Sequence, residues 1–216
     1  MRKKPDVFSG VSHLIGAVLS LAALVALVTV AAHYGSVWHV VSFAIFGASL
    51  IMLYTASTLY HLIPAGPKWI TILRKLDHSM IFVLIAGSYT PYCLVALRGP
   101  WGYGLLAAVW GIAALGIVLK IFWLGAPRWL YTGFYLFMGW LVVVAIVPLV
   151  QNVPRQALLW LAVGGLLYTV GAVFYGTKWP KLRPGVFGFH EIWHLFVIGG
   201  SFAHFWSVFR YVSRME

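Results

Sequence analysis

Seven long apolar stretches fill almost the whole of this 216-residue chain, separated by short polar breaks. Each stretch exceeds the ~20 residues that an α-helix needs to cross the hydrocarbon core of a membrane. Hydrophobic residues make up 62% of the sequence and charged residues only 9%, which excludes a soluble domain with a water-facing surface. We therefore expect an all-α integral membrane protein of the cell (inner or plasma) membrane, a single seven-helix bundle over residues 1–216, with helices at residues 11–32, 38–62, 77–97, 101–123, 129–150, 156–176 and 190–212.

Lysine and arginine are distributed unevenly between the two ends of these predicted helices. Eleven lie in the N-terminus and in the second-to-third, fourth-to-fifth and sixth-to-seventh connections, and four lie at the other end. Because cytoplasmic loops retain Lys and Arg, we predict a cytoplasmic N-terminus and a C-terminus outside. The basic residues are scattered and form no stripe, so we expect contacts with membrane lipids and no nucleic-acid partner.

Polar side chains that suit a metal site lie at the same end of three predicted helices. His61 ends the second helix and Asp77 begins the third, while His190 and His194 begin the seventh. Ser57 lies four residues before His61, and the two histidines of the seventh helix have the same spacing, so each pair shares one helix face. The distribution of Lys and Arg places all five residues at the cytoplasmic boundary, without showing that they are neighbours.

The chemistry of this set suits zinc, which in catalytic sites typically has three protein ligands and one open position. We predict that His61, His190 and His194 bind it. A carboxylate in a membrane helix is costly and is a functional candidate by default, so Asp77 could orient a metal-bound water. The metal would lower the pKa of that water toward ~7, with Asp77 or Glu191 as the proton acceptor. Ser57 would donate a hydrogen bond at the same site.

Each of these residues also has an ordinary structural explanation. Histidines at helix ends are often simply interfacial. Asp77 could cap its helix beside Arg74 or Lys75, and Ser57 could bond the backbone of its own helix. The occurrence of all of them at one level favours the metal site.

Residues 190–194 read His-Glu-Ile-Trp-His, the H-E-x-x-H pattern in which a metalloprotease uses glutamate as its general base. The extended metzincin pattern needs a third histidine at position 200, where this chain has Gly200. Glu191 is therefore an optional contributor to the site, and an intramembrane metalloprotease is a minor alternative. His13 opens the first helix at the same level and is a further candidate member.

Taken together, these motifs resemble the hemolysin III family, within the progestin and adiponectin receptor superfamily. The stretches that carry the resemblance are Ala56–His61, Leu76–His78, Ile85–Pro91, Gly199–Ser201 and His204–Phe205. The resemblance implies seven helices with a cytoplasmic N-terminus, zinc held by the three histidines, and Asp77 and Ser57 in positions that contact water or support the ligands. Glu191 is not part of that family's shared pattern.

The superfamily is similar to the alkaline ceramidases, which are zinc-dependent lipid amide hydrolases. We accordingly predict a metal-dependent hydrolase that acts on a lipid-like amide or ester entering from the bilayer and that contributes to membrane lipid homeostasis. The alternative is a non-enzymatic receptor or membrane-state sensor, in which zinc ties the second and seventh helices together. A cytolysin is a further alternative, although permanently apolar spans are typical of a resident membrane protein.

Overall fold

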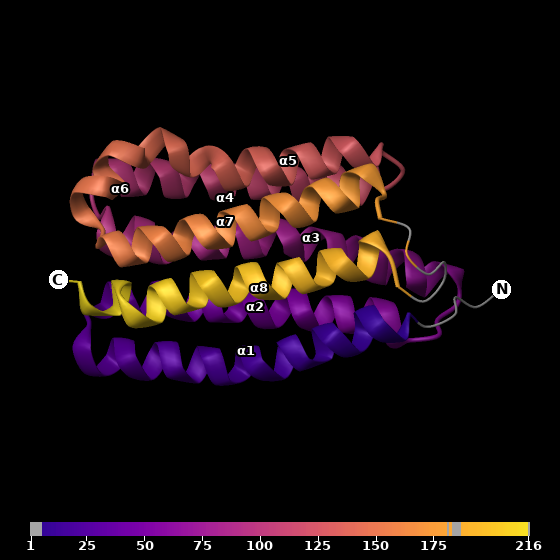
Figure 1. Ribbon diagram of the computed structural model, residues 1–216, viewed down its shortest axis with the longest axis horizontal. Coiled ribbons are helices and arrows are strands. Elements are labelled where there is room, and N and C mark those ends of the chain that lie inside the picture. The colour runs from indigo at the N-terminus through magenta and orange to yellow at the C-terminus, as the bar shows by residue number, and fades with distance from the viewer. Residues whose placement is uncertain (1–5, 181, 183–186, 216) are drawn as a thin grey trace.

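The computed structural model describes residues 6–180, 182 and 187–215 and shows a bundle of long helices running along one axis (Figure 1). Within these residues, seven helical segments are long and apolar enough to cross a membrane, which confirms the predicted fold class. The segments are α1 (Val7–Tyr34), α2 (Val37–Leu62), α3 (Pro67–Pro91) with η1 (Tyr92–Ala96), α4 (Pro100–Phe122), α5 (Arg128–Trp140) with η2 (Leu141–Ala145) and α6 (Ile146–Asn152), α7 (Arg155–Thr177), and α8 (Phe189–Arg210) with η3 (Val212–Arg214).

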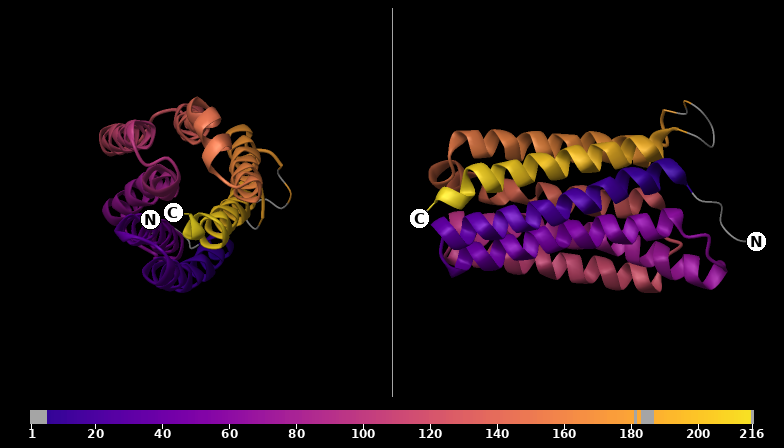
Figure 2. Two further views of the ribbon diagram at one scale, coloured as in Figure 1. Left: turned by 90° about the vertical axis from the view of Figure 1, so that its left-hand side faces the viewer. Right: turned by 90° about the horizontal axis from the view of Figure 1, so that it is seen from below.

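The helices follow one another around the bundle in chain order, as the end-on view shows (Figure 2). Helix α8 closes the arrangement by packing against both α7 and α1. As a result, the start of α8 lies at the same end of the bundle as the end of α2 (Figure 1). This closure is what brings residues from both ends of the sequence to one level.

Helix α3 begins at Pro67, which corrects the predicted start at residue 77. Proline is favoured in the first turn of a helix because its missing N–H would have no partner there. The first turns of α3 carry Lys68, Arg74 and Lys75 and are too polar for a hydropathy pattern to reveal. Asp77 therefore lies inside the helix, where it is buried. The other spans differ from the predicted ones by a few residues at each end.

The fifth span changes geometry in its middle, where α5 gives way to the 3₁₀ turns of η2 before α6. Pro148 explains the break, because its ring excludes the carbonyl four residues earlier and it has no N–H to donate. Tyr89 of α3 stabilises the interruption: its hydroxyl accepts a hydrogen bond from the Val142 N–H (2.9 Å) and donates one to the Gly139 carbonyl (2.6 Å). Backbone groups freed inside the bundle thus find a partner on another helix.

A close backbone contact fixes the turn between η1 and α4. The Gly102 N–H donates to the Leu97 carbonyl (3.0 Å). A methyl group on Gly102 would overlap the carbonyl oxygens of Cys93 and Leu97. Gly104, one half-turn later on the same helix, faces open space.

We therefore expect Gly102→Ala to lower the free energy of unfolding by ~1–3 kcal/mol, the usual cost of overpacking. Gly104→Ala is the matched control, and it should leave stability unchanged or raise it, since alanine favours helix more than glycine does. Thermal unfolding of both variants in detergent measures the difference. Equal melting temperatures for the two variants would contradict the described turn.

The polar connections described by the structure lie at the ends of the bundle that the distribution of basic residues predicts. The α2–α3 and α4–α5 connections lie at the end where α1 and α8 begin, and the C-terminus lies at the opposite end (Figure 1). Five of the basic residues used to predict orientation lie outside the described residues, namely Arg2, Lys3, Lys4, Lys181 and Arg183. The orientation itself stays a prediction.

Reporter fusions to the full chain test that orientation. Alkaline phosphatase fused after residue 216 should be active, because it folds only outside the cytoplasm, and a fluorescent protein fused before residue 1 should be fluorescent inside the cell. An inactive phosphatase at the C-terminus, together with fluorescence from a fluorescent protein fused at that end instead, would contradict the predicted orientation.

Candidate metal centre

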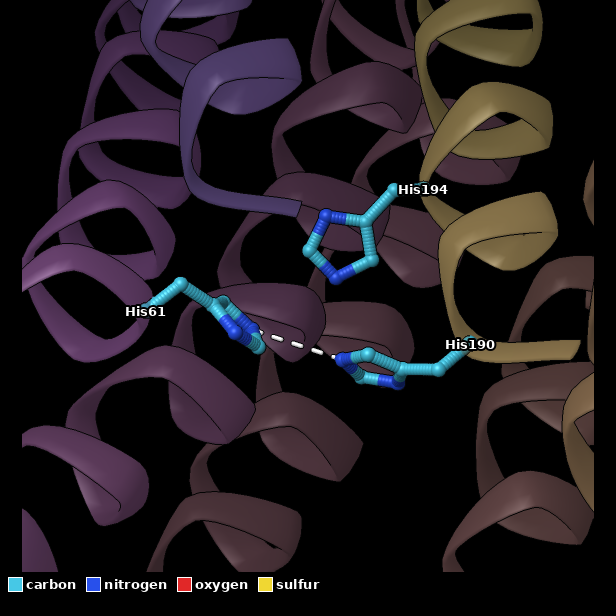
Figure 3. A group of neighbouring side chains, drawn as sticks. All are labelled: His61, His190 and His194. Carbon is cyan, nitrogen blue, oxygen red and sulfur yellow. Dashed lines mark hydrogen bonds between the residues drawn. The ribbon is translucent and has the colours of Figure 1, made fainter. Parts of the chain in front are cut away.

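Three histidines from two helices turn their rings toward one space between α2 and α8 (Figure 3). His61 lies in the last turn of α2, and His190 and His194 lie in the first two turns of α8. One ring nitrogen from each residue lies within 4.8 Å of the others. His61 and His194 are only 3% exposed, and His190 is half-buried. The structure thus brings together the three histidines that the sequence placed at one level.

The separation of the ring nitrogens suits a single metal ion. Tetrahedral zinc with Zn–N distances of ~2.0–2.1 Å sets its ligand nitrogens ~3.3 Å apart. The Nε2 atoms of His61 and His190 are 3.4 Å apart. Imidazole also binds copper, iron and nickel, so these donors define a metal site without selecting one metal. The three histidines could therefore hold one ion and leave a further position open.

The other two predicted site residues share a cavity with two of these histidines. Ser57 and Asp77 are buried and line a cavity of about 730 Å³, whose wall also includes His190 and His194. Cavities of ~300–1,000 Å³ are typical of small-molecule sites. Asp77 and Ser57 are thus placed to face whatever occupies the cavity.

His13 of α1 packs directly on the site. Its ring stacks on that of His194 with centroids 3.8 Å apart and meets Tyr54 edge-on at 4.9 Å. Neither ring nitrogen of His13 has a hydrogen-bond partner among the described residues. His13 lies outside the group of three whose nitrogens are within mutual reach, so its position indicates a wall residue.

Glu191 has a structural contact that accounts for its presence between the two histidines. Its Oε2 accepts a hydrogen bond from the Gly188 N–H at 2.6 Å, just before α8 begins. A carboxylate in this position satisfies an otherwise unpaired backbone donor and interacts favourably with the helix dipole. The H-E-x-x-H spacing is therefore explained without giving Glu191 a role as a base.

Two charged residues near the site, one of them fully buried, were not predicted from the sequence. Lys120, near the end of α4, is 3% exposed, lines the cavity and places its ammonium 3.6 Å from the ring centre of Tyr131. A lysine within an apolar span is a signal that could have identified it. Asp6 lies beside His61, with its Oδ2 3.4 Å from the ring Nδ1. A capping residue so close to the N-terminus gave no such signal.

Asp6 lies before the first membrane span, and its surroundings favour the charged carboxylate. Burial by itself would raise the pKa of the Asp6 carboxyl group. The neighbouring His61 side chain and hydrogen bonding from Ser9 outweigh that effect and lower the pKa well below its usual value. Asp6 is therefore ionised at neutral pH.

Comparison with known proteins identifies the family. The family model described as haemolysin-III related matches residues 1–205. The chain belongs to the haemolysin-III-related family. Among its relatives are the Hemolysin-3 homolog of Bacillus subtilis, 46% identical over 212 residues (98% of this chain and 96% of the relative), and Hemolysin-3 of Bacillus cereus, 44% identical over 209 residues (97% and 92%). The human Monocyte to macrophage differentiation factor is 26% identical over 182 residues (82% and 73%).

Membership in the haemolysin-III-related family confirms the resemblance read from the motifs. It agrees with the seven apolar helices of the structure, and the protein is a multi-pass integral membrane protein. The family match extends over α1, α2 and most of α8, and so covers every residue of the candidate metal centre.

Single replacement of each histidine tests the centre. His61→Ala, His190→Ala and His194→Ala should each lose bound metal, because a site with two remaining ligands binds far more weakly, while the wild type retains about one ion per chain. Elemental mass spectrometry of protein purified in detergent without chelator measures this. His33→Ala is the control, since His33 is exposed near the end of α1 away from the site. Equal metal content in all variants would refute the centre.

Proposed function

We propose that this haemolysin-III-related protein is a zinc-dependent hydrolase that acts on a lipid-like amide or ester. One observation carries the proposal: the three histidines lie within reach of one ion, and two of them, His190 and His194, line the same cavity as Asp77 and Ser57. Three nitrogen ligands, a buried carboxylate and a hydroxyl are the groups that metal-assisted hydrolysis requires.

The cavity has the shape and lining that an acyl chain needs. Its wall is largely apolar and reaches from the histidines to Leu97, Leu105 and Leu149, which lie toward the other end of the bundle. Basic side chains line the end near the histidines, namely Arg74, Lys120, Arg128 and Lys178. A lipid with its polar linkage near the histidines and its chain along the bundle axis would match both regions.

The three histidines, Asp77 and Ser57 have separate roles in the proposed hydrolysis. A zinc ion held by His61, His190 and His194 would supply a Lewis acid that polarises a carbonyl oxygen and lowers the pKa of water. Asp77 accepts a proton as the water oxygen adds to the carbonyl carbon, and returns it to the leaving nitrogen or oxygen when that bond breaks. Ser57 donates a hydrogen bond at the same wall. The products are a carboxylic acid and an amine or alcohol.

A second candidate is a non-enzymatic receptor or sensor in which the metal ties α2 to α8. The deep burial of His61 and His194 and the stacking of His13 on His194 favour it, because a structural metal is closed off from solvent. The presence of Asp77 and Ser57 in the cavity wall beside His190 and His194 favours the hydrolase.

Asp77→Asn separates the two functions. The amide keeps the size of the side chain but cannot accept the proton, so turnover of ceramide-like or phospholipid substrates in detergent should fall ~10²–10⁴-fold. Metal content and unfolding temperature should stay at wild-type values.

Glu191→Gln is the matched control for that change of carboxylate to amide. The glutamine oxygen can still accept from the Gly188 N–H, so lipid turnover should stay within a few-fold of wild type. A wild-type rate in Asp77→Asn would contradict the hydrolase, and a collapse in Glu191→Gln alone would point to a protease mechanism instead.

A further inference from the structure

Asp6 contacts His61 through both its backbone and its side chain. Its backbone N–H donates to the His61 carbonyl at 3.0 Å, and its Oδ2 lies 3.4 Å from the His61 Nδ1. The first contact fixes the chain just before α1 against the last turn of α2. The second brings a carboxylate to the Nδ1 side of the ring, whereas Nε2 faces His190.

The chemistry of a metal-binding imidazole explains why a carboxylate would lie next to the His61 Nδ1. A neutral imidazole carries one proton, so a ring that binds metal through one nitrogen must hold its proton on the other. The Nε2 of His61 faces the Nε2 of His190 across the site, so the proton belongs on Nδ1. Histidines that bind metals almost always donate that N–H to a carboxylate, a carbonyl or a water.

Asp6 is the acceptor that the structure offers for this proton. The His61 Nδ1 is buried and has no hydrogen-bond partner of ordinary length among the described residues. The 3.4 Å separation from Asp6 is longer than the ~2.7–2.9 Å of a charge-assisted hydrogen bond, and a small rotation of either side chain closes it. A buried donor without a partner is costly, which drives that closure.

We propose that Asp6 is a positioning residue of the metal centre: its carboxylate accepts the Nδ1 proton of His61 and thereby keeps Nε2 free and aimed at the metal. This inference rests on the metal site of the proposed function and does not depend on hydrolysis. It also gives α1 a role, since the helix carries the group that orients a ligand on α2.

Close packing keeps Asp6 in place for this role. A methyl group on Gly10 would overlap the Leu62 side chain, so α1 and α2 approach each other tightly next to His61. Phe8 also meets Phe187 edge-on with ring centroids 5.0 Å apart. The start of α1 thus packs against both α2 and the segment that leads into α8.

Asp6 also caps α1, and a test must separate the two roles. Its Oδ1 accepts a hydrogen bond from the Ser9 N–H at 3.2 Å. Serine and asparagine cap helices as well as aspartate does, whereas alanine does not. Asp6→Ser keeps the cap but has no group that reaches His61. Asp6→Asn keeps the cap through its oxygen and turns an N–H₂ donor toward Nδ1, which disfavours the required tautomer.

The decisive measurement is zinc affinity, obtained by competition with a chelator of known affinity in the detergent-purified full chain. We expect Asp6→Ser and Asp6→Asn to bind zinc ~10–100-fold more weakly than wild type, as loss of such a supporting partner usually does. The unfolding temperature of the metal-free protein should not change in either variant. Wild-type affinity in Asp6→Ser would overturn the inference and leave the metal centre intact.

Asp6→Ala distinguishes capping from positioning. If zinc affinity falls in Asp6→Ala and returns to the wild-type value in Asp6→Ser, the residue acts only as a cap and the proposal is wrong. A wild type that binds no zinc would overturn the metal centre and this inference together.

The tautomer of His61 gives a readout that needs neither metal nor substrate. In metal-free protein labelled with ¹⁵N-histidine, the ring shifts of His61, assigned by comparison with His61→Ala, should show protonation on Nδ1. Asp6→Ser should shift the ring toward a mixture of tautomers. A proton on Nε2 in the wild type would contradict the proposed role of Asp6.

Discussion

The site depends on the way helix α8 is fixed to the rest of the bundle by polar contacts at several depths. Near one end, His190 and His194 meet His61 of α2; in the middle, the Tyr54 hydroxyl donates to Ser201 (2.8 Å); farther along, the Tyr92 hydroxyl donates to Ser207 (2.6 Å). Because lipid tails are as apolar as the helix faces, the hydrophobic effect does not drive membrane helices together. Polar contacts and close packing therefore specify how the helices meet. The same contacts set the rotation of α8 that turns both of its histidines toward α2.

Several ring nitrogens around the site have no hydrogen-bond partner among the described residues. The Nδ1 atoms of His61 and His194 and both nitrogens of His13 are buried without hydrogen-bond partners among the described residues. Such atoms are costly in an apolar interior and commonly mark a ligand site. A metal site with its supporting contacts accounts for these polar atoms. It lies next to a cavity that combines apolar walls with Asp77 and Ser57.

Much of this fold follows from hydropathy and spacing, and the exceptions have physical causes. The four-residue spacing of His190 and His194 places them on one face, and the distribution of Lys and Arg puts His61 at their level. Neither pattern specifies how far apart the helices that carry these histidines lie, because only packing determines that distance. The start of α3 at Pro67 was missed because its first turns are polar. Asp6 was missed because its role comes from a tertiary contact with His61, which no local pattern in the sequence encodes.

X-ray absorption spectroscopy of the bound metal tests the central claim most directly. In wild-type protein purified in detergent without added metal, we expect a zinc edge with about three imidazole ligands at ~2.0–2.1 Å and a light-atom ligand in the remaining position. A spectrum with a sulfur shell at ~2.3 Å or with oxygen ligands alone would place the metal elsewhere. Either of those spectra, or the absence of bound metal, would contradict a centre built by His61, His190 and His194.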